Sequence, residues 1–237
     1  MLKQSAPPDA VRLGMRQGES LTHTASLARL GGRARAGLEA RPICAMSRAV
    51  DAFLSSTALV ALAEIGDKTQ LLALVLAARF RTPWPILAGI LLATLANHAL
   101  AALLGASAAA WLEGPWFGAA VAVGFVAMGL WTLVPDKLDE DEAPPSGRSA
   151  FLTTLVAFFL VEIGDKTQIA TIALGARYGD VAAVTAGTTL GMLLANAPVV
   201  LAGDALIKRV PLQAVRIAAA AVFIAMGVWL LWTRWPL

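Results

Sequence analysis

Six long apolar blocks dominate this sequence and limit the folds that it can adopt. Each is about as long as, or longer than, the roughly 20 residues that a helix needs to cross the hydrocarbon layer of a bilayer. The blocks lack the alternation of apolar and polar residues that marks a membrane-spanning β-strand. The sequence therefore predicts an all-α integral membrane protein with six transmembrane helices. The predicted spans are about 51–79, 84–106, 116–134, 151–175, 180–205 and 213–233.

Composition and the distribution of charge agree with a membrane protein. Of the 237 residues, 58% are hydrophobic and 15% are charged, whereas soluble domains carry about 25% charged residues. Of the 19 basic and 16 acidic residues, seven basic and three acidic ones lie within residues 1–45. The remainder is close to neutral, so we expect the lipid bilayer and not nucleic acid as its surroundings. A homo-oligomer is compatible with the sequence.

The first 45 residues differ in composition from the rest of the chain. They are rich in Arg, Ala, Gly and Ser, and they lack the apolar segment of a secretory signal. This extension is interpreted either as disordered or as the product of a start codon assigned too far upstream, with Met46 as the first residue. The single cysteine, Cys44, lies here, so no intrachain disulfide is expected.

A seven-residue motif, EIGDKTQ, occurs twice in the chain. It occupies residues 64–70 and recurs 98 positions later at residues 162–168. The same offset relates FVAMGLW at 125–131 to FIAMGVW at 223–229. A seven-residue repeat that includes three charged residues cannot arise from apolar composition bias. The sequence therefore predicts two homologous halves of three helices each.

An odd number of helices in each half requires the halves to enter the membrane in opposite directions. Such inverted repeats are typical of secondary transporters, whose binding sites lie near the midplane where the halves meet. We expect a first repeat at 46–135, an acidic linker at 136–150 and a second repeat at 151–237.

Basic residues predict the orientation. Three of the expected connections lie on the side of the linker, and they hold Arg79, Arg81, Lys137, Arg148, Lys208, Arg209 and Arg216. The opposite side, without the extension, holds only Arg48, Arg177 and Arg234. The positive-inside rule then places the linker in the cytoplasm.

Four acidic residues of the two motifs lie deep inside apolar blocks. An ionisable side chain at such depth costs about 2.5–3.5 kcal/mol even on insertion scales, so it usually faces the protein interior and marks an ion or proton pathway. On a continuous helix, positions three apart project from one side. Two motifs that met across the halves would therefore surround one cavity with four carboxylates, which belong to Glu64, Asp67, Glu162 and Asp165.

Further oxygen donors accompany these carboxylates. An oxygen-rich, acidic site suits hard divalent ions such as Ca²⁺, Mg²⁺ and Mn²⁺. The sequence has no cluster of His and Cys residues that would favour zinc or copper, and His98 is interpreted as a packing or hydrogen-bonding residue. No tightly bound cofactor is expected, because the metal is the transported substrate. The supporting ligands are predicted to be Thr69, Gln70, Thr167, Gln168, Asn97 and Asn196.

The glycines and lysines of the motifs leave alternatives open. Gly66 and Gly164 allow either close helix approach or a local unwinding that frees backbone carbonyls. Lys68 and Lys166 are candidate counter-ions. On an ideal helix Lys68 lies near Glu64, so it could occupy the site in the absence of metal, or it could turn outward toward the membrane surface.

The site itself suggests how protons are involved. Four carboxylates crowded at low dielectric cannot all remain ionised after the metal leaves. Metal binding then displaces protons, and metal release takes them up, so cation/proton exchange follows without a separate proton path.

These motifs resemble those of the Gdt-type family of membrane cation/proton exchangers. The family carries a doubled E-x-G-D-K-T/S motif, and it includes Golgi Mn²⁺/Ca²⁺ transporters and bacterial manganese exporters. The resemblance covers residues 46–237 and implies that Glu64, Asp67, Glu162 and Asp165 coordinate the cation. It implies an antiporter, not an enzyme, that exports Mn²⁺, with Ca²⁺ as the other candidate, from the cytoplasm. The short loops resemble those of bacterial members, which implies a multi-pass protein of the bacterial inner membrane.

Three other functions would also use acidic residues in a membrane. A passive divalent-cation channel would carry metal regardless of the pH gradient, and a metal-sensing membrane scaffold would bind the ion without moving it. An intramembrane aspartyl hydrolase could activate water with paired aspartates, but proteolysis gives no reason for the repeated glutamate and lysine.

Overall fold

The structure is a computed structural model, and the described residues belong to one compact unit, Arg48–Leu237, with two residues that precede it. The predicted extension 1–45 lies outside the described residues, as do positions 136–147 of the linker predicted at 136–150. The described residues are 46–112, 114–135, 148–203 and 211–234.

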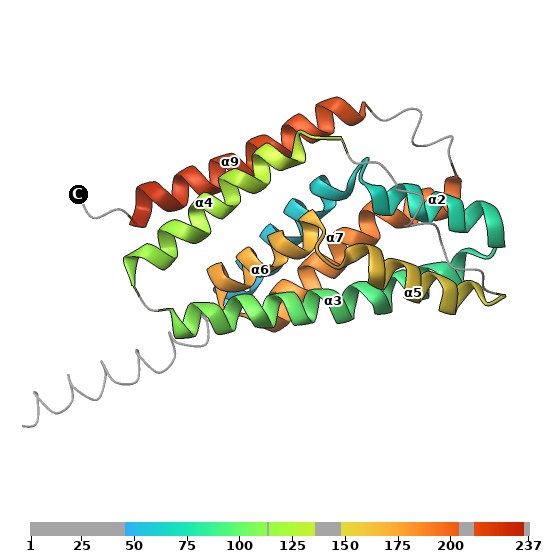
Figure 1. The fold of residues 1–237 in the computed structure, drawn as a ribbon, viewed down its shortest axis with the longest axis horizontal. Helices are drawn as coiled ribbons and strands as arrows, with labels where there is room; N and C mark the ends of the chain where they lie inside the picture. Colours follow the sequence, from blue (N-terminus) through green and yellow to red (C-terminus); the bar gives the residue numbers. More distant parts are fainter. Residues whose placement is uncertain (1–45, 113, 136–147, 204–210, 235–237) are drawn as a thin grey trace, which may run out of the picture. The chain divides into compact units, whose positions relative to one another are not determined.

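The described residues form helices, which confirms the predicted all-α class (Figure 1). Four of the helices are long and apolar enough to cross a membrane, namely Met46–Glu64, Pro83–Trp111, Val181–Ala202 and Leu212–Thr233. The apolar helices that end at Thr132 and Glu162 are shorter. The helix bounds are Met46–Glu64, α2 Lys68–Phe80, α3 Pro83–Trp111, α4 Pro115–Thr132, α5 Ala150–Glu162, α6 Lys166–Tyr178, α7 Val181–Ala202 and α9 Leu212–Arg234.

Both motifs interrupt blocks that the sequence predicted as continuous spans. The first helix ends at Glu64 and α2 begins at Lys68, while α5 ends at Glu162 and α6 begins at Lys166. Each of the spans predicted over 51–79 and 151–175 is therefore two helices and not one. The glutamate and aspartate of one motif do not share a helix face, because each aspartate starts a new helix.

The glycine before each aspartate is the physical reason for the break. Gly66 has φ +83° and Gly164 has φ +80°, in the left-handed region that other residues rarely adopt. Asp67 and Asp165 follow with extended backbone, at φ −85° and −76°, as the N-caps of α2 and α6. Of the two roles left open for these glycines, local unwinding is the one that the structure has.

The two halves contact each other through equivalent residues. Gly89 on α3 lies so close to α5 that an added Cβ would be 2.9 Å from the carbonyl oxygen of Phe151. Gly187 on α7 packs in the same way against the carbonyl oxygen of Phe53. The two glycines are 98 positions apart, and so are the two phenylalanines. The contact that one half makes is thus repeated with the roles of the halves exchanged.

The pair α4 and α9 follows the same pattern. Phe125 and Phe223, which are 98 positions apart, stack with ring centroids separated by 6.3 Å. Gly129 on α4 and Gly227 on α9 each face the backbone of the other helix, where an added Cβ would approach a carbonyl oxygen to 2.8 and 2.6 Å. A residue that stacks on its own equivalent is the arrangement expected around a twofold axis.

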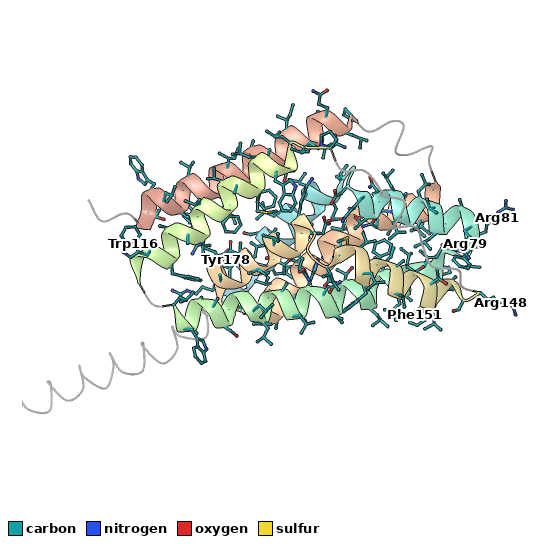
Figure 2. The ribbon with its side chains drawn as sticks, viewed as in Figure 1. Arg79, Arg81, Trp116, Arg148, Phe151 and Tyr178 are labelled. Atoms are coloured by element: carbon teal, nitrogen blue, oxygen red, sulfur yellow. The ribbon has the colours of Figure 1, made fainter. Side chains whose placement is uncertain are left out.

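The remaining helices surround the motifs. Helix α3 packs against α5, α6 and α7, and α2 packs against α7. Figure 2 shows Arg79, Arg81 and Arg148 at one end of this helical unit, whereas Trp116 and Tyr178 lie at the other. The end with the three arginines is the one at which α3 and α5 begin. These basic residues therefore lie on the same side as the end of the predicted linker.

Candidate metal centre

Three of the four predicted carboxylates form one buried cluster. Glu64, Asp67 and Asp165 each offer an oxygen, and these oxygens all lie within 4.8 Å of one another. Their exposed fractions are 0%, 4% and 5%. Within the described part of the chain this is the only group of three or more acidic, His or Cys residues so arranged. The cluster joins both carboxylates of the first motif to the aspartate of the second.

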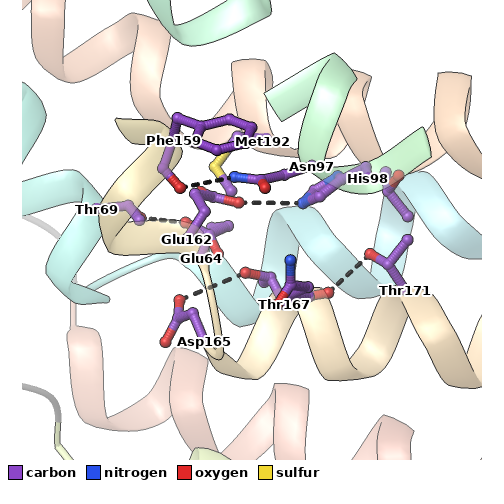
Figure 3. A network of polar contacts seen from close by, with 12 residues as sticks. Glu64, Thr69, Asn97, His98, Phe159, Glu162, Asp165, Thr167, Thr171 and Met192 are labelled. Carbon is purple, nitrogen blue, oxygen red and sulfur yellow. Dashed lines mark hydrogen bonds and ion pairs between the residues drawn. The ribbon is translucent and has the colours of Figure 1, made fainter. Parts of the chain in front are cut away.

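The threonines of the motifs donate to this cluster. The Thr69 hydroxyl donates a hydrogen bond to Oε2 of Glu64, and the Thr167 hydroxyl lies 3.5 Å from Oδ2 of Asp165 (Figure 3). The other Glu64 oxygen, Oε1, is buried and has no hydrogen-bond partner among the described residues. Buried polar atoms in proteins are nearly always paired, so this oxygen is available to a cation.

The fourth carboxylate has a different neighbour. Glu162 is fully buried at the end of α5, and its Oε2 lies 3.2 Å from Nε2 of His98 on α3, which is also fully buried (Figure 3). Sequence reasoning had assigned His98 to packing or hydrogen bonding and did not connect it with a motif. The available signal was a histidine next to Asn97 in an otherwise apolar block.

The glutamines hold the interrupted backbone. Oε1 of Gln70 accepts a hydrogen bond from the Gly66 amide at 2.9 Å, and Oε1 of Gln168 accepts one from the Gly164 amide at 2.8 Å. The Gln70 side chain also donates to the carbonyl oxygen of Ala195 on α7 at 2.9 Å. In this structure the two glutamines therefore satisfy amides that the unwinding would otherwise leave unpaired, and their carbonyl oxygens are not directed to an ion.

The two asparagines bind backbone through their amide nitrogens. Asn97 donates to the carbonyl oxygen of Phe159 at 3.0 Å, and Asn196 donates to that of Met192 at 3.1 Å. Both are fully buried, and the side-chain oxygen of each has no hydrogen-bond partner among the described residues. Each asparagine thus donates its amide N–H to a backbone carbonyl oxygen, and its own side-chain oxygen remains for a ligand.

The two lysines have different surroundings although their motifs are identical. Nζ of Lys68 lies 3.7 Å from Oδ1 of Asp165, in the other half of the chain. The break removes the helical relation between Lys68 and Glu64 on which the predicted pairing was based. Nζ of Lys166 instead donates to the carbonyl oxygen of Val134 at 3.1 Å and lies 5.8 Å from the centre of the Trp131 ring.

The resulting donor set is rich in oxygen and negative in charge. When ionised, the three clustered carboxylates carry three negative charges, which the Lys68 ammonium offsets in part. Buried charges of one sign are costly unless they are paired or coordinate a metal. Carboxylate and hydroxyl oxygens are the ligands that hard divalent cations prefer. The arrangement can therefore hold a divalent cation between the two halves of the chain.

Comparisons with known proteins agree with this chemistry. The chain matches the family described as divalent cation/proton antiporter GDT1 over residues 52–140 and 150–236. A Vibrio cholerae protein named "Putative manganese exporter" is 51% identical over 185 residues, which are 78% of this chain and 92% of that protein. "GDT1-like protein 5" of Arabidopsis thaliana is 30% identical over 221 residues, with 77% of this chain and 96% of the relative covered. No solved structure matches. The chain is therefore a membrane transporter and not an enzyme, and it belongs to the GDT1 family of divalent cation/proton antiporters.

Proposed function

We propose that this chain exchanges a divalent cation for protons and exports the metal from the cytoplasm, with Mn²⁺ as the favoured ion and Ca²⁺ as the other candidate. The observation that carries the proposal is the buried cluster of Glu64, Asp67 and Asp165, whose oxygens lie within 4.8 Å of one another. The unpaired Glu64 oxygen supports a cation ligand at this point. The preference for Mn²⁺ is supported by the name of the relative that is 51% identical.

Glu162 and the polar residues near the motifs belong to the same proposal. Glu162 completes the four carboxylates as a ligand of a second conformation or as a neighbour of the bound ion. The threonines supply hydroxyl oxygens, and the asparagines supply the amide oxygens described above. Lys68 acts as the counter-ion of the cluster, 3.7 Å from Asp165. Lys166 occupies the same motif position in the second half, and we propose it as the second counter-ion.

Six transmembrane segments in two inverted repeats, 46–135 and 151–237, form the architecture that we propose. The exchanged contacts of Gly89 and Gly187 support it, as does the stacking of Phe125 on Phe223. In transporters built this way, the repeats rock about a site at their interface and expose it to each side in turn. A cluster with ligands from both motifs would be opened and closed by such a movement.

The linker at 136–150 is proposed to be cytoplasmic, in a bacterial inner membrane. Arg79, Arg81 and Arg148 gather at the end of the unit where the described chain resumes after the linker (Figure 2), in agreement with the positive-inside rule. Protons that are more abundant outside would then drive export. When the cation leaves, protons neutralise carboxylates that are costly to keep charged away from water.

A flux assay tests the proposal. Full-length protein is reconstituted in sealed liposomes under an imposed pH gradient, and Mn²⁺ and Ca²⁺ movements are followed by fluorescence. We expect Mn²⁺ flux that depends on the gradient and disappears in Asp67→Asn. Asp180→Asn is the matched control, because Asp180 caps α7 through the Ala183 amide at 2.9 Å and Asn caps helices equally well.

The same assay separates the rival functions. Metal flux that ignores the pH gradient would identify a channel, and binding without flux would identify a scaffold. Gradient-driven flux that survives in Asp67→Asn would place the cation site elsewhere in the molecule.

A further inference from the structure

The interrupted backbone of the first motif is bound by α9, which belongs to the second half of the chain. Nη2 of Arg216 donates a hydrogen bond to the carbonyl oxygen of Gly66 at 3.2 Å. Leu212 packs against the same glycine, since an added Cβ at Gly66 would lie 3.0 Å from its Cδ2 atom. Gln70 accepts from the Gly66 amide, so both backbone polar groups of this glycine are paired. The break in the first motif therefore depends on a helix of the other half.

The second motif lacks this arrangement. At the offset of 98 positions, Arg216 corresponds to Gly118, which has no side chain that could donate a hydrogen bond. Gly164, the equivalent of Gly66, is exposed, and an added Cβ there would meet nothing within 4 Å. The two motifs have the same sequence, so the difference arises from residues outside them.

The peptide unit that Arg216 binds lies between two of the clustered carboxylates. Its carbonyl belongs to Gly66 and its N–H to Asp67, and that N–H donates to the carbonyl oxygen of Glu64 at 3.0 Å. A rotation of this peptide would break the hydrogen bond to Glu64 and change φ of Asp67, on which the direction of its side chain depends. Hydrogen bonds from a charged donor are roughly twice as strong as neutral ones, so the guanidinium is suited to oppose such a rotation.

We propose that Arg216 is a positioning residue that fixes the peptide between Gly66 and Asp67, and thereby holds the Asp67 carboxylate in the cluster. This inference rests on the proposed function. In transporters with discontinuous helices, unwound carbonyl oxygens can coordinate the transported cation. The Gly66 oxygen is instead bound by a guanidinium, so the first motif meets the ion through its carboxylates and not through this carbonyl.

A positioning role and a purely electrostatic role predict opposite changes in metal affinity. As a positive charge near an acidic site, Arg216 would repel the cation, and its removal would tighten metal binding. As the residue that holds Asp67 in place, Arg216 supports binding, and its removal would weaken it. The sign of the change in the apparent Kd therefore separates the two roles.

Mn²⁺ binding by the purified full-length chain measures that sign. The apparent Kd is taken from the rise in Tm, because a ligand that binds only the folded state stabilises it. Arg216→Gln removes the charge and shortens the side chain, and we expect it to raise the Kd by about tenfold, as for the loss of a hydrogen bond to a charged group. Arg216→Lys should recover most of the affinity, because one hydrogen bond does not need the planar fork of arginine. Arg148→Gln is the matched control, since Arg148 is exposed and its variant should leave the Kd unchanged.

Amide hydrogen exchange shows whether the effect is local, and the second motif is the internal control. The Asp67 amide donates to the carbonyl oxygen of Glu64 at 3.0 Å, and the Asp165 amide donates to that of Glu162 at 3.2 Å. We expect Arg216→Gln to speed exchange at Asp67 by about tenfold and to leave Asp165 unchanged. Equal acceleration at both amides would indicate a general loss of stability and would overturn the positioning role.

Leu212→Ala provides a second route if Arg216→Gln does not fold. It removes packing against Gly66 without a change of charge. A positioning role of this contact region predicts a higher Kd for Mn²⁺, though by less than in Arg216→Gln, and faster exchange at Asp67 alone. No change in either quantity would overturn the inference.

The outcomes that overturn the inference are distinct from those that overturn the proposed function. A Kd that falls or stays the same in Arg216→Gln, while the wild type binds and transports Mn²⁺, would refute the role of Arg216. Wild-type protein that neither gained stability from Mn²⁺ nor transported it would refute the proposed function, and this inference with it.

Discussion

Replacement of Gly164 by alanine isolates the contribution of the unwound backbone. Gly164 has φ +80°, and an added Cβ would have no atom within 4 Å. The substitution therefore introduces no clash, and its cost is the conformational penalty of an L-residue in the left-handed region, about 1–2 kcal/mol. A change of this size alters the ratio of folded to unfolded protein by a factor of roughly 5–30.

Gly179 provides a matched control. It has φ +69° at the end of α6, and an added Cβ there also meets nothing within 4 Å. We expect Gly164→Ala and Gly179→Ala to lower the free energy of unfolding by similar amounts. Only the former should reduce Mn²⁺ flux per folded molecule, because the backbone of Gly164 sets the direction from which Asp165 enters the cluster.

Denaturant unfolding of the purified protein and flux in liposomes measure the two effects separately. Equal losses of flux in both variants would show that reduced stability, and not the geometry of the break, limits transport. Unchanged stability in Gly164→Ala would show that this residue does not have the left-handed conformation on which the reasoning depends.

Three other perturbations follow from the described contacts. Lys68→Met removes the ammonium beside Asp165, so the apparent Kd for Mn²⁺ should fall by roughly fivefold, as for an ion pair of about 1 kcal/mol; weaker binding in a titration would show that Lys68 supports the site. Gly129→Val introduces atoms where a Cβ already approaches its neighbour to 2.6 Å, and it should lower stability in denaturant by about 1–3 kcal/mol. Gly124→Val, with no atom within 4 Å, should cost less, and an equal cost would contradict the packing argument. Mn²⁺ at 100 times its Kd should stabilise the wild type by about 2.7 kcal/mol, and Glu64→Gln should lose most of that gain in a thermal unfolding assay.

Some features of this protein depend on local sequence properties and could be predicted from the chain. Apolar length decides whether a helix can reside in a membrane, and the composition of the blocks was enough to predict an all-helical membrane protein. The repetition of EIGDKTQ identified the acidic residues because an ionisable group in an apolar block is too costly to retain without a function. The family followed from the same residues.

The course of the backbone through the motifs was not predictable in the same way. Glycine permits both close helix packing and a left-handed turn, and the surrounding apolar residues are equally compatible with one continuous helix. The break is stabilised by side chains, since Gln70 and Gln168 accept the hydrogen bonds of the glycine amides. The length and composition of an apolar block carry no information about such a hydrogen bond. The blocks 51–79 and 151–175 were therefore each predicted as one span.

The sequence by itself determined which residues carry charge into the membrane and that they occur in two equivalent sets. Only the tertiary structure decided how those sets differ. Lys68 reaches Asp165 in the other half, and Glu162 meets His98 from α3. Both contacts join residues that are distant in the chain, and two identical motifs contain no information about which neighbour each will meet. Packing of the helices around them supplies that difference, because it brings a histidine to one glutamate and no equivalent residue to the other.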